Sequence, residues 1–438
     1  MKDSLNEVEQ KKPWFSGDED LSAILCYILL GMSEECFGYD TFLSVFTWRY
    51  GSREMRRVFS EVEGRLAWRR IWVELAEAQS AFSLVSKEEL DDLKSNMERV
   101  DLKKAHEVER RIRHDVMAEI QTYAEQCPKG GGKIHLGATS MDIEDNADVL
   151  RMRRALDIIL TRLISCLDAA SRRVEEYKRL VCLGWTHLQP AEPTTLGYRI
   201  ANYAQDLLLD LKLTEVLLQD FLKGKGIKGA VGTSASFKRL LGDKGTPLSL
   251  EEKVMRNLSL EAFPVSTQTY PRKLDYIVLS LLAGIAQSAY KFAFDVRLLQ
   301  SPVYGEVSEP IGRAQVGSTA MPFKRNPVTS ERICSIARYV SMLPAVAVIN
   351  ASNTLLERTL DDSANRRIII PEAFLAVDEC LMLYQRVMEG LKVYPKRIRR
   401  NLESYGPFAG TEAVLMKLVE KGEDRQKMHE LIRRYSFK

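Results

Sequence analysis

Five long segments carry apolar residues at the helical period, and they constrain the fold more than any other feature of the chain. They lie near residues 143–180, 194–223, 272–300, 328–352 and 370–393, and several exceed twenty residues. Ordinary globular helices are shorter, and long helices joined by loops favour an elongated bundle. Strands do not alternate with helices, so the pattern argues against a Rossmann-type sheet. The sequence therefore predicts an all-α protein.

Shorter helical patterns precede the long segments. One begins at Arg53 and a second covers about 101–126, where the glycines of "CPKGGGKIHLGATS" end it. Residues 1–40 show no clear period, and we expect a poorly ordered extension there. We predict an N-terminal helical domain over 41–139, a central helical bundle domain over 140–393, and an apparently shortened C-terminal helical domain over 394–438.

The charge balance and the cysteines limit the class of protein. Lys and Arg total 63 against 60 Asp and Glu, a net charge of +3, which does not indicate a nucleic-acid binder. The seven cysteines are scattered, odd in number and form no CxxC pair, so they are read as the reduced thiols of a cytoplasmic protein.

One apolar stretch has the length of a membrane span. It covers residues 274–294, but Asp275, Gln287 and Lys291 interrupt it, so we interpret it as a buried bundle helix. The apolar run at 22–32 is too short to cross a bilayer, and the acidic residues before it do not fit a signal peptide.

The loop "VGSTAMPFKRNP" (316–327) interrupts the helical pattern with proline, glycine and positive charge. Serine is a weak base in water, so proton abstraction by Ser318 needs a local positive field, which Lys324 and backbone N–H groups can supply. The same donors can stabilise negative charge on a substrate, and closure of the loop would exclude water. The alternative is a mobile connector.

The five histidines suggest acid–base chemistry more than metal binding. His106 and Glu107 begin an HExxH pattern, but Arg110 occupies the second histidine position, and we expect no metal site. His187 lies in "WTHLQPAEPTT", which we interpret as a turn entering a helix; it is either a solvated residue or a general acid or base. His114 is either part of a salt-bridged helix surface or an oriented imidazole in a pocket.

Two further polar segments leave alternatives open. The stretch "KGKGIKGAVGT" (223–233) could hold a phosphate with backbone N–H groups and lysine, although a flexible surface loop is the more common structure. The stretch "ERTLDDSANRR" (357–367) is either a solvated, internally paired helix face or a binder of carboxylate and phosphate groups.

The loop at 317–327, "GSTAMPFKRNP", resembles the GSSxMPxKxNP signature of the fumarase/aspartase superfamily, with Thr319 in place of the second serine. Across about residues 44–437 the chain is more closely similar to the adenylosuccinate lyase family. The stretches that carry this likeness are "RRIRHDVMAE", "KIHLGATSMDIEDNAD", "GWTHLQPAEPTTLG", "TQTYPRKLD" and "LERTLDDSANRR".

The resemblance implies a three-part all-α fold whose central helices assemble into the core of a homotetramer, with active sites shared between subunits. It implies β-elimination of fumarate from N6-succinyl-AMP and from the succinylated carboxamide ribotide of purine biosynthesis, without a cofactor, a nucleic acid or a membrane. The alternatives are a non-catalytic structural relative and a sister fumarate-releasing lyase such as argininosuccinate lyase.

The resemblance also assigns residues. The catalytic candidates are Ser318 as base, His187 as acid, Lys324 as a charge-stabilising group and His114 as a substrate-contacting imidazole. The substrate-binding candidates are Arg49, Tyr50, Arg113, Asp115, Thr139, Ser140, Gln268, Asn326, Arg332, Arg358, Ser363 and Arg367.

Overall fold

The computed structural model describes residues 42–312 and 314–437. The extension predicted at residues 1–40 therefore lies outside the described residues. The chain divides into two compact units, Met1–Trp48 and Arg49–Lys438. The described part of the first unit contains the short helix α2 (Val45–Trp48). All that follows concerns the second unit.

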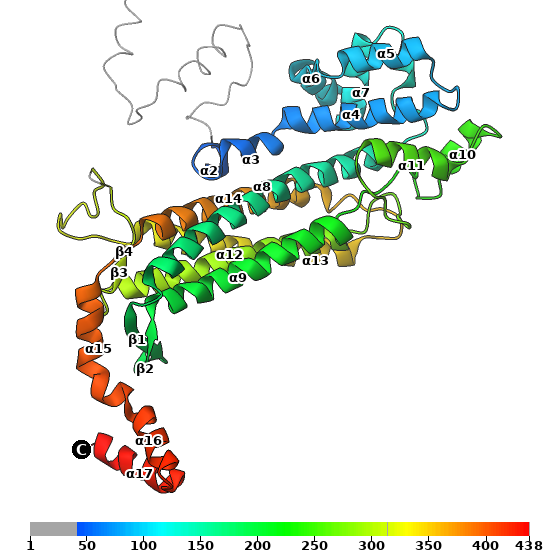
Figure 1. Ribbon diagram of the computed structural model, residues 1–438. Helices are drawn as coiled ribbons and strands as arrows, with labels where there is room; N and C mark the ends of the chain where they lie inside the picture. The colour runs from blue at the N-terminus through cyan, green and yellow to red at the C-terminus, as the bar shows by residue number, and fades with distance from the viewer. Residues whose placement is uncertain (1–41, 313, 438) are drawn as a thin grey trace, which may run out of the picture. The chain divides into compact units, whose positions relative to one another are not determined.

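Five long helices form the body of this unit and pack side by side (Figure 1). They are α8 (Ser140–Tyr177), α9 (Leu196–Val216), α12 (Lys273–Gln300), α13 (Val328–Asn353) and α14 (Ser363–Gly390). The all-α prediction is confirmed. Helix α14 begins earlier than the predicted 370, because Asn365 and Arg366 in its first turn are polar residues that bind partners inside the protein and break the apolar pattern.

Smaller helices complete the unit. Before α8 come α3 (Arg53–Val58), α4 (Glu61–Ser80), α5 (Lys87–Asn96), α6 (Leu102–Ile112), α7 (Asp115–Gln126) and the 3-10 turn η1 (Gly131–Lys133). Between α9 and α12 come the π-helical turn η2 (Leu217–Phe221), α10 (Ala235–Leu241) and α11 (Pro247–Asn257). The chain continues after α14 with α15 (Pro395–Ala409), α16 (Thr411–Glu420) and α17 (Arg425–Ser436).

The segment predicted as one helix over 101–126 is two helices. Arg113 has a left-handed backbone, with φ of +58°, and ends α6. His114 then has an extended backbone and caps the start of α7, where its Nδ1 accepts a hydrogen bond from the Met117 amide at 3.4 Å. Side-chain caps of this kind satisfy amide groups that a helix start leaves without partners.

The described residues contain two small antiparallel sheets. Strands β1 (Val181–Thr186) and β2 (Gln189–Thr195) form a hairpin, and β3 (Val307–Ser308) pairs with β4 (Lys392–Val393). Helices α12 and α13 have the length and apolarity of membrane spans, with 50% and 44% of their most apolar stretches buried. Both pack against other bundle helices, and α12 buries side chains along its whole length, from Leu274 to Leu299.

The bundle has two ends, which we name by what lies there. At the "α14 end", Arg366 in the first turn of α14 binds Asp275 in the first turn of α12 at 2.7 Å. At the "hairpin end", Arg199 in the first turn of α9 binds Glu306, just after α12, at 3.0 Å. Helix α13 runs between the two ends with 26 residues, so the ends are separated by about 40 Å.

Candidate active site

The loop before α13 closes on itself at its neck. The Asn326 side chain donates to the Gly317 carbonyl at 2.9 Å, and a Cβ added at Gly317 would lie 2.2 Å from the Lys324 carbonyl oxygen. Inside the loop, the Ser318 hydroxyl accepts a hydrogen bond from the Met321 amide at 3.1 Å. Ser318, Lys324 and Asn326 are thus brought together on one loop at the hairpin end.

A buried carboxylate holds the base of this loop. Glu309 accepts hydrogen bonds from the amides of Thr329 at 2.9 Å and Ser330 at 2.8 Å, and from the Ser330 hydroxyl at 2.8 Å. These amides belong to the first turn of α13, where a negative charge is favoured by the helix dipole. Gln300 joins the two segments, because it accepts from the Glu309 amide and donates to the Arg325 carbonyl.

His187 occupies the tip of the β1–β2 hairpin. Thr186 pairs with Gln189, so His187 and Leu188 alone form the turn, and both have a left-handed backbone, with φ of +53° and +60°. The predicted turn is correct, but it leads into strand β2 rather than directly into a helix, and the two strands were not predicted. Pro190 and Pro193 argue against a central strand; a hairpin of two edge strands tolerates them.

At the α14 end, α7 meets α14 through an ion pair. Arg367 donates to the Asp115 carboxylate at 2.6 Å and lies 3.6 Å from Glu144. Burial raises the pKa of Asp115, but hydrogen bonds from Arg367 and the Val116 amide, together with the charges of Arg367 and Arg65, outweigh burial and hold that pKa below its ordinary value. His114 is exposed on this surface, and its Nδ1 lies 3.5 Å from the Asp115 carboxylate.

Glu144 has an unusual environment for a carboxyl group. Burial, together with the neighbouring carboxylates of Asp115 and Asp148, raises its pKa to about 8. Arg367 acts in the opposite direction but does not cancel these effects. Glu144 is the fifth residue of α8, and although it lies in the stretch "KIHLGATSMDIEDNAD", the sequence did not single it out as a site residue.

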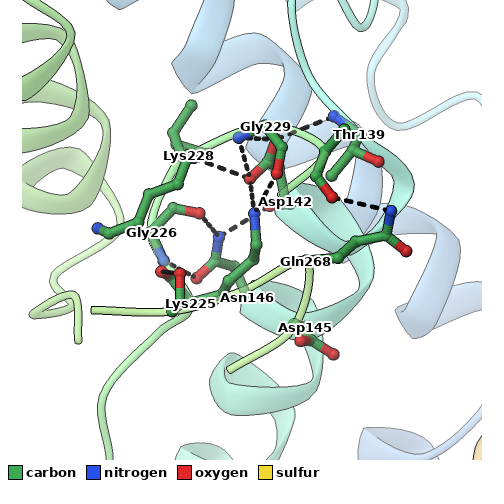
Figure 2. A network of polar contacts seen from close by, with 12 residues as sticks. Thr139, Asp142, Asp145, Asn146, Lys225, Gly226, Lys228, Gly229 and Gln268 are labelled. Carbon is green, nitrogen blue, oxygen red and sulfur yellow. Dashed lines mark hydrogen bonds and ion pairs between the residues drawn. The ribbon is translucent and has the colours of Figure 1, made fainter. Parts of the chain in front are cut away.

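Thr139 and Ser140 begin α8 beside a buried polar network (Figure 2). The Asp142 carboxylate accepts from the amides of Thr139 at 2.9 Å, Lys228 at 2.9 Å and Gly229 at 3.0 Å. It also forms an ion pair with Lys225, and both of these side chains are fully buried.

This network corrects both interpretations of the glycine-rich stretch at 223–233. A flexible surface loop is wrong, because Lys225 and Ile227 are almost completely buried. A phosphate cradle is also wrong, because its amides donate to Asp142 and the Lys228 ammonium binds Glu251 at 2.5 Å.

Gln268 connects this network to the segment before α14. Its side-chain amide donates to the Ala230 carbonyl at 3.0 Å, and its backbone amide donates to the Glu357 carbonyl at 3.2 Å. Arg358 then binds Asp362 at 2.7 Å, and Arg272 binds the other oxygen of Asp362 at 2.6 Å.

The stretch at 357–367 is therefore an internal ion-pair network around Asp362 and Arg366, both of which are buried. The interpretation as a solvated face is wrong for these two residues. Arg367 remains exposed, and Ser363 is half-buried at the start of α14.

Two of the remaining candidates lie beside the aromatic ring of a third. The guanidinium groups of Arg49 and Arg332 each lie 5.8 Å from the centre of the Tyr50 ring. The amide of Gly51, the next residue, donates to Glu379 of α14 at 3.1 Å. Because Arg332 is in the second turn of α13, this group belongs with the hairpin end.

The candidates therefore form two groups in one subunit. The group at the hairpin end contains His187, Ser318, Lys324, Asn326, Arg332, Arg49 and Tyr50. The group at the α14 end contains Arg113, His114, Asp115, Thr139, Ser140, Gln268, Arg358, Ser363 and Arg367. Within residues 42–312 and 314–437, no group of three His, Cys, Asp or Glu side chains is arranged to hold a metal ion.

The chain is similar to known lyases. A family model described as Lyase matches residues 61–341. The adenylosuccinate lyase of Schistosoma mansoni is 43% identical over 402 residues, which cover 91% of this chain and 83% of the relative. The adenylosuccinate lyase of Pyrococcus abyssi is 36% identical over 396 residues, 89% of this chain and 86% of the relative.

Solved structures share the fold. The fumarate lyase from Mesorhizobium sp. BNC1 aligns with a TM-score of 0.78 at 24% identity, over 90% of this chain and 86% of that one. The 3-carboxy-cis,cis-muconate lactonizing enzyme from Pseudomonas putida aligns with a TM-score of 0.78 at 26% identity, over 89% and 86% of the two chains.

Proposed function

We infer, because this chain belongs to the adenylosuccinate lyase family, that it is a carbon–nitrogen lyase that releases fumarate from N6-succinyl-AMP and leaves AMP. The same elimination converts the succinylated aminoimidazole carboxamide ribotide to the free carboxamide in purine biosynthesis. The relatives reported above do not favour the non-catalytic alternative or the argininosuccinate lyase alternative.

The elimination requires a base and an acid on opposite sides of the bond that breaks. We propose that Ser318 removes the proton from the carbon beside a succinyl carboxylate, that the electron pair forms the new double bond, and that the carbon–nitrogen bond breaks. His187 donates a proton to the departing nitrogen. General acid–base catalysis of this kind contributes roughly 10²–10⁴-fold to a rate.

The closed loop is the observation that carries this proposal. Its neck contact between Asn326 and Gly317 draws together the two ends of the short segment that carries Ser318 and Lys324. We propose that the positive charge of Lys324 favours the alkoxide of Ser318 and stabilises the carboxylate that gains electron density as the proton leaves. The exposed position of the loop leaves these groups accessible to a substrate.

The substrate carries a phosphate and two carboxylates, which explains the supply of cations and hydroxyls among the remaining candidates. We propose that the nucleotide is contacted by Arg49, Tyr50, Arg358, Ser363 and Arg367. Asn326 and Lys324 hold the succinyl carboxylates, and further substrate contacts come from Arg113, His114, Asp115, Thr139, Ser140, Gln268 and Arg332. Arginine suits such groups because its planar fork binds two oxygens at once.

We propose a homotetramer in which each active site takes residues from more than one subunit. The separation of the candidates between two ends of the bundle supports this, because one subunit cannot bring both groups to one substrate. Exposed apolar side chains along the long helices support it too, among them Leu209, Leu213, Phe294, Met342 and Ile349. Such surfaces mark protein–protein contacts.

We also propose a cytoplasmic location. The buried free thiols of the described residues fit a reducing compartment; they are Cys127, Cys166, Cys182, Cys334 and Cys380.

The proposed function is tested by following the loss of ultraviolet absorbance as purified protein converts N6-succinyl-AMP to AMP. Ser318→Ala and His187→Ala are expected to lose at least 100-fold in kcat while remaining folded. Full activity in both variants would contradict the assigned roles.

A further inference from the structure

We propose that helix α15 positions the proposed acid, His187, by holding the β1–β2 hairpin from outside the bundle. The proposal rests on the proposed function, since it concerns the acid of that reaction. The positioning residues are Tyr405 and Asn401 of α15 and Trp185 of the hairpin, and none of them touches the substrate in the proposed reaction.

The hairpin needs such support. A two-stranded hairpin alone is marginally stable in water. Its turn is also strained, because His187 and Leu188 both have the left-handed backbone that Asn-Gly or Gly-Gly normally supplies in a two-residue turn. Each non-glycine residue in that conformation costs about 1–2 kcal/mol, so contacts elsewhere must stabilise the arrangement.

An aromatic cluster provides the first contact. Trp185 lies two residues before His187, where the pairing of β1 with β2 is irregular. Its ring meets the ring of Tyr304 edge to face at 4.9 Å between centres, and the ring of Tyr405 edge to face at 5.8 Å. Edge-to-face pairs are worth about 0.5–1.5 kcal/mol beyond their buried area. The indole of Trp185 is thus fixed between α15 and the segment after α12.

A buried carboxylate provides the second contact. Glu306 is fully buried, and it binds Arg199 at 3.0 Å on one side and the Asn401 side chain at 3.0 Å on the other. Arg199 also donates to the Leu183 carbonyl in β1 at 2.7 Å. A chain of hydrogen bonds therefore runs from α15 through Glu306 to the strand that leads to His187.

Both contacts act on the same strand from the same helix. A change in α15 therefore shifts the His187 imidazole relative to the leaving nitrogen, without touching the groups that bind the phosphate. Misplacement of a catalytic group by about 1 Å can cost on the order of 100-fold in rate. The expected effect falls on kcat, because protonation of the leaving group belongs to the transition state, whereas KM stays near its wild-type value.

The test is a double-mutant cycle between Tyr405 and His187 on the full-length protein. Tyr405→Ala is expected to lower kcat at least tenfold with KM within twofold, and Tyr405→Phe, which keeps the ring, is expected to restore most of the loss. In the His187→Ala background, Tyr405→Ala should cause no further loss, because there is no imidazole left to misplace. Glu403→Ala, at an exposed position on the same helix, is the control and should behave as wild type.

Other outcomes are equally decisive. Equal losses from Tyr405→Ala with and without His187 would mean a general structural role and would overturn the proposal. Full activity of His187→Ala would instead contradict the proposed role of His187 as the acid, whatever Tyr405→Ala does. If Tyr405→Ala does not fold, Asn401→Ala takes its place in the same cycle, since it breaks the second contact and leaves the aromatic cluster intact.

Discussion

Asn326 binds the carbonyl of Gly317 across nine residues of chain at 2.9 Å, and this contact closes the loop that carries Ser318 and Lys324. No side chain fits at Gly317, where a Cβ would lie 2.2 Å from the Lys324 carbonyl. We expect Gly317→Ala to open the neck and to reduce kcat/KM more than tenfold, with little change in the unfolding temperature. Steady-state kinetics measure the loss.

Gly312→Ala is the matched control for Gly317→Ala. A Cβ at Gly312 would meet the Gln315 side chain at 3.8 Å, an ordinary contact, so this variant should keep wild-type activity. Equal activity of the two variants would show that the neck does not position the loop.

Glu309 stabilises the first turn of α13 from a position nineteen residues before that helix begins. Glu309→Ala leaves two amides and one hydroxyl without their acceptor in a buried site, so we expect a loss of about 2–4 kcal/mol in the free energy of unfolding. Glu309→Gln keeps one acceptor oxygen and should lose less. Urea denaturation of both variants measures the two losses in the free energy of unfolding. Equal losses would mean that the acceptor oxygens of Glu309 do not hold the first turn of α13.

The buried pair of Asp142 and Lys225 fixes the start of α8 to the glycine-rich segment. Asp142→Asn keeps the shape but leaves the Lys225 ammonium buried without a countercharge, which should cost about 3–5 kcal/mol. Glu261→Ala breaks the exposed pair with Lys223 in the same segment and should leave the free energy of unfolding nearly unchanged. Denaturation midpoints measure the stability of the two variants, and similar midpoints would contradict the prediction.

Glu144 should make stability depend on pH. Its pKa is raised in the folded protein from 4.5 to about 8, so between these values the folded state holds a proton that the unfolded state has released. Stability contributed by this group therefore falls as pH rises from about 5 to 8. Glu144→Gln removes this dependence, and its unfolding temperature should exceed that of the wild type increasingly over that range. A constant difference between the two proteins would contradict the assignment.

The long helices could be predicted because periodicity is a local property of the sequence. The segments near 272–300 and 328–352 match α12 and α13 within one residue. The loop at 316–327 could be predicted for the same reason, since its prolines and glycine interrupt the period. Local patterns also located the turn at His187.

The partners of these segments could not be predicted. Asp142 and Lys225 are 83 residues apart in sequence, and no spacing rule connects them. Taken alone, the lysines of 223–233 suggested a solvent-exposed loop or a phosphate-binding site. In the folded protein Lys225 and Lys228 are buried beside two carboxylates and form internal ion pairs. The hairpin was not predicted because β2 contains prolines. Proline is rare in central strands, so its presence argues against a strand when the sequence is read alone.

In the proposed tetramer, one active site needs the hairpin end of one subunit and the α14 end of another. The most direct measurement mixes two inactive variants, His187→Ala and His114→Ala, after brief dissociation and reassociation, and follows the conversion of N6-succinyl-AMP. Random exchange leaves both residues intact in one site in four, so we predict recovery of about a quarter of the wild-type rate. No recovery in a mixture whose subunits have demonstrably exchanged would contradict a site shared between subunits.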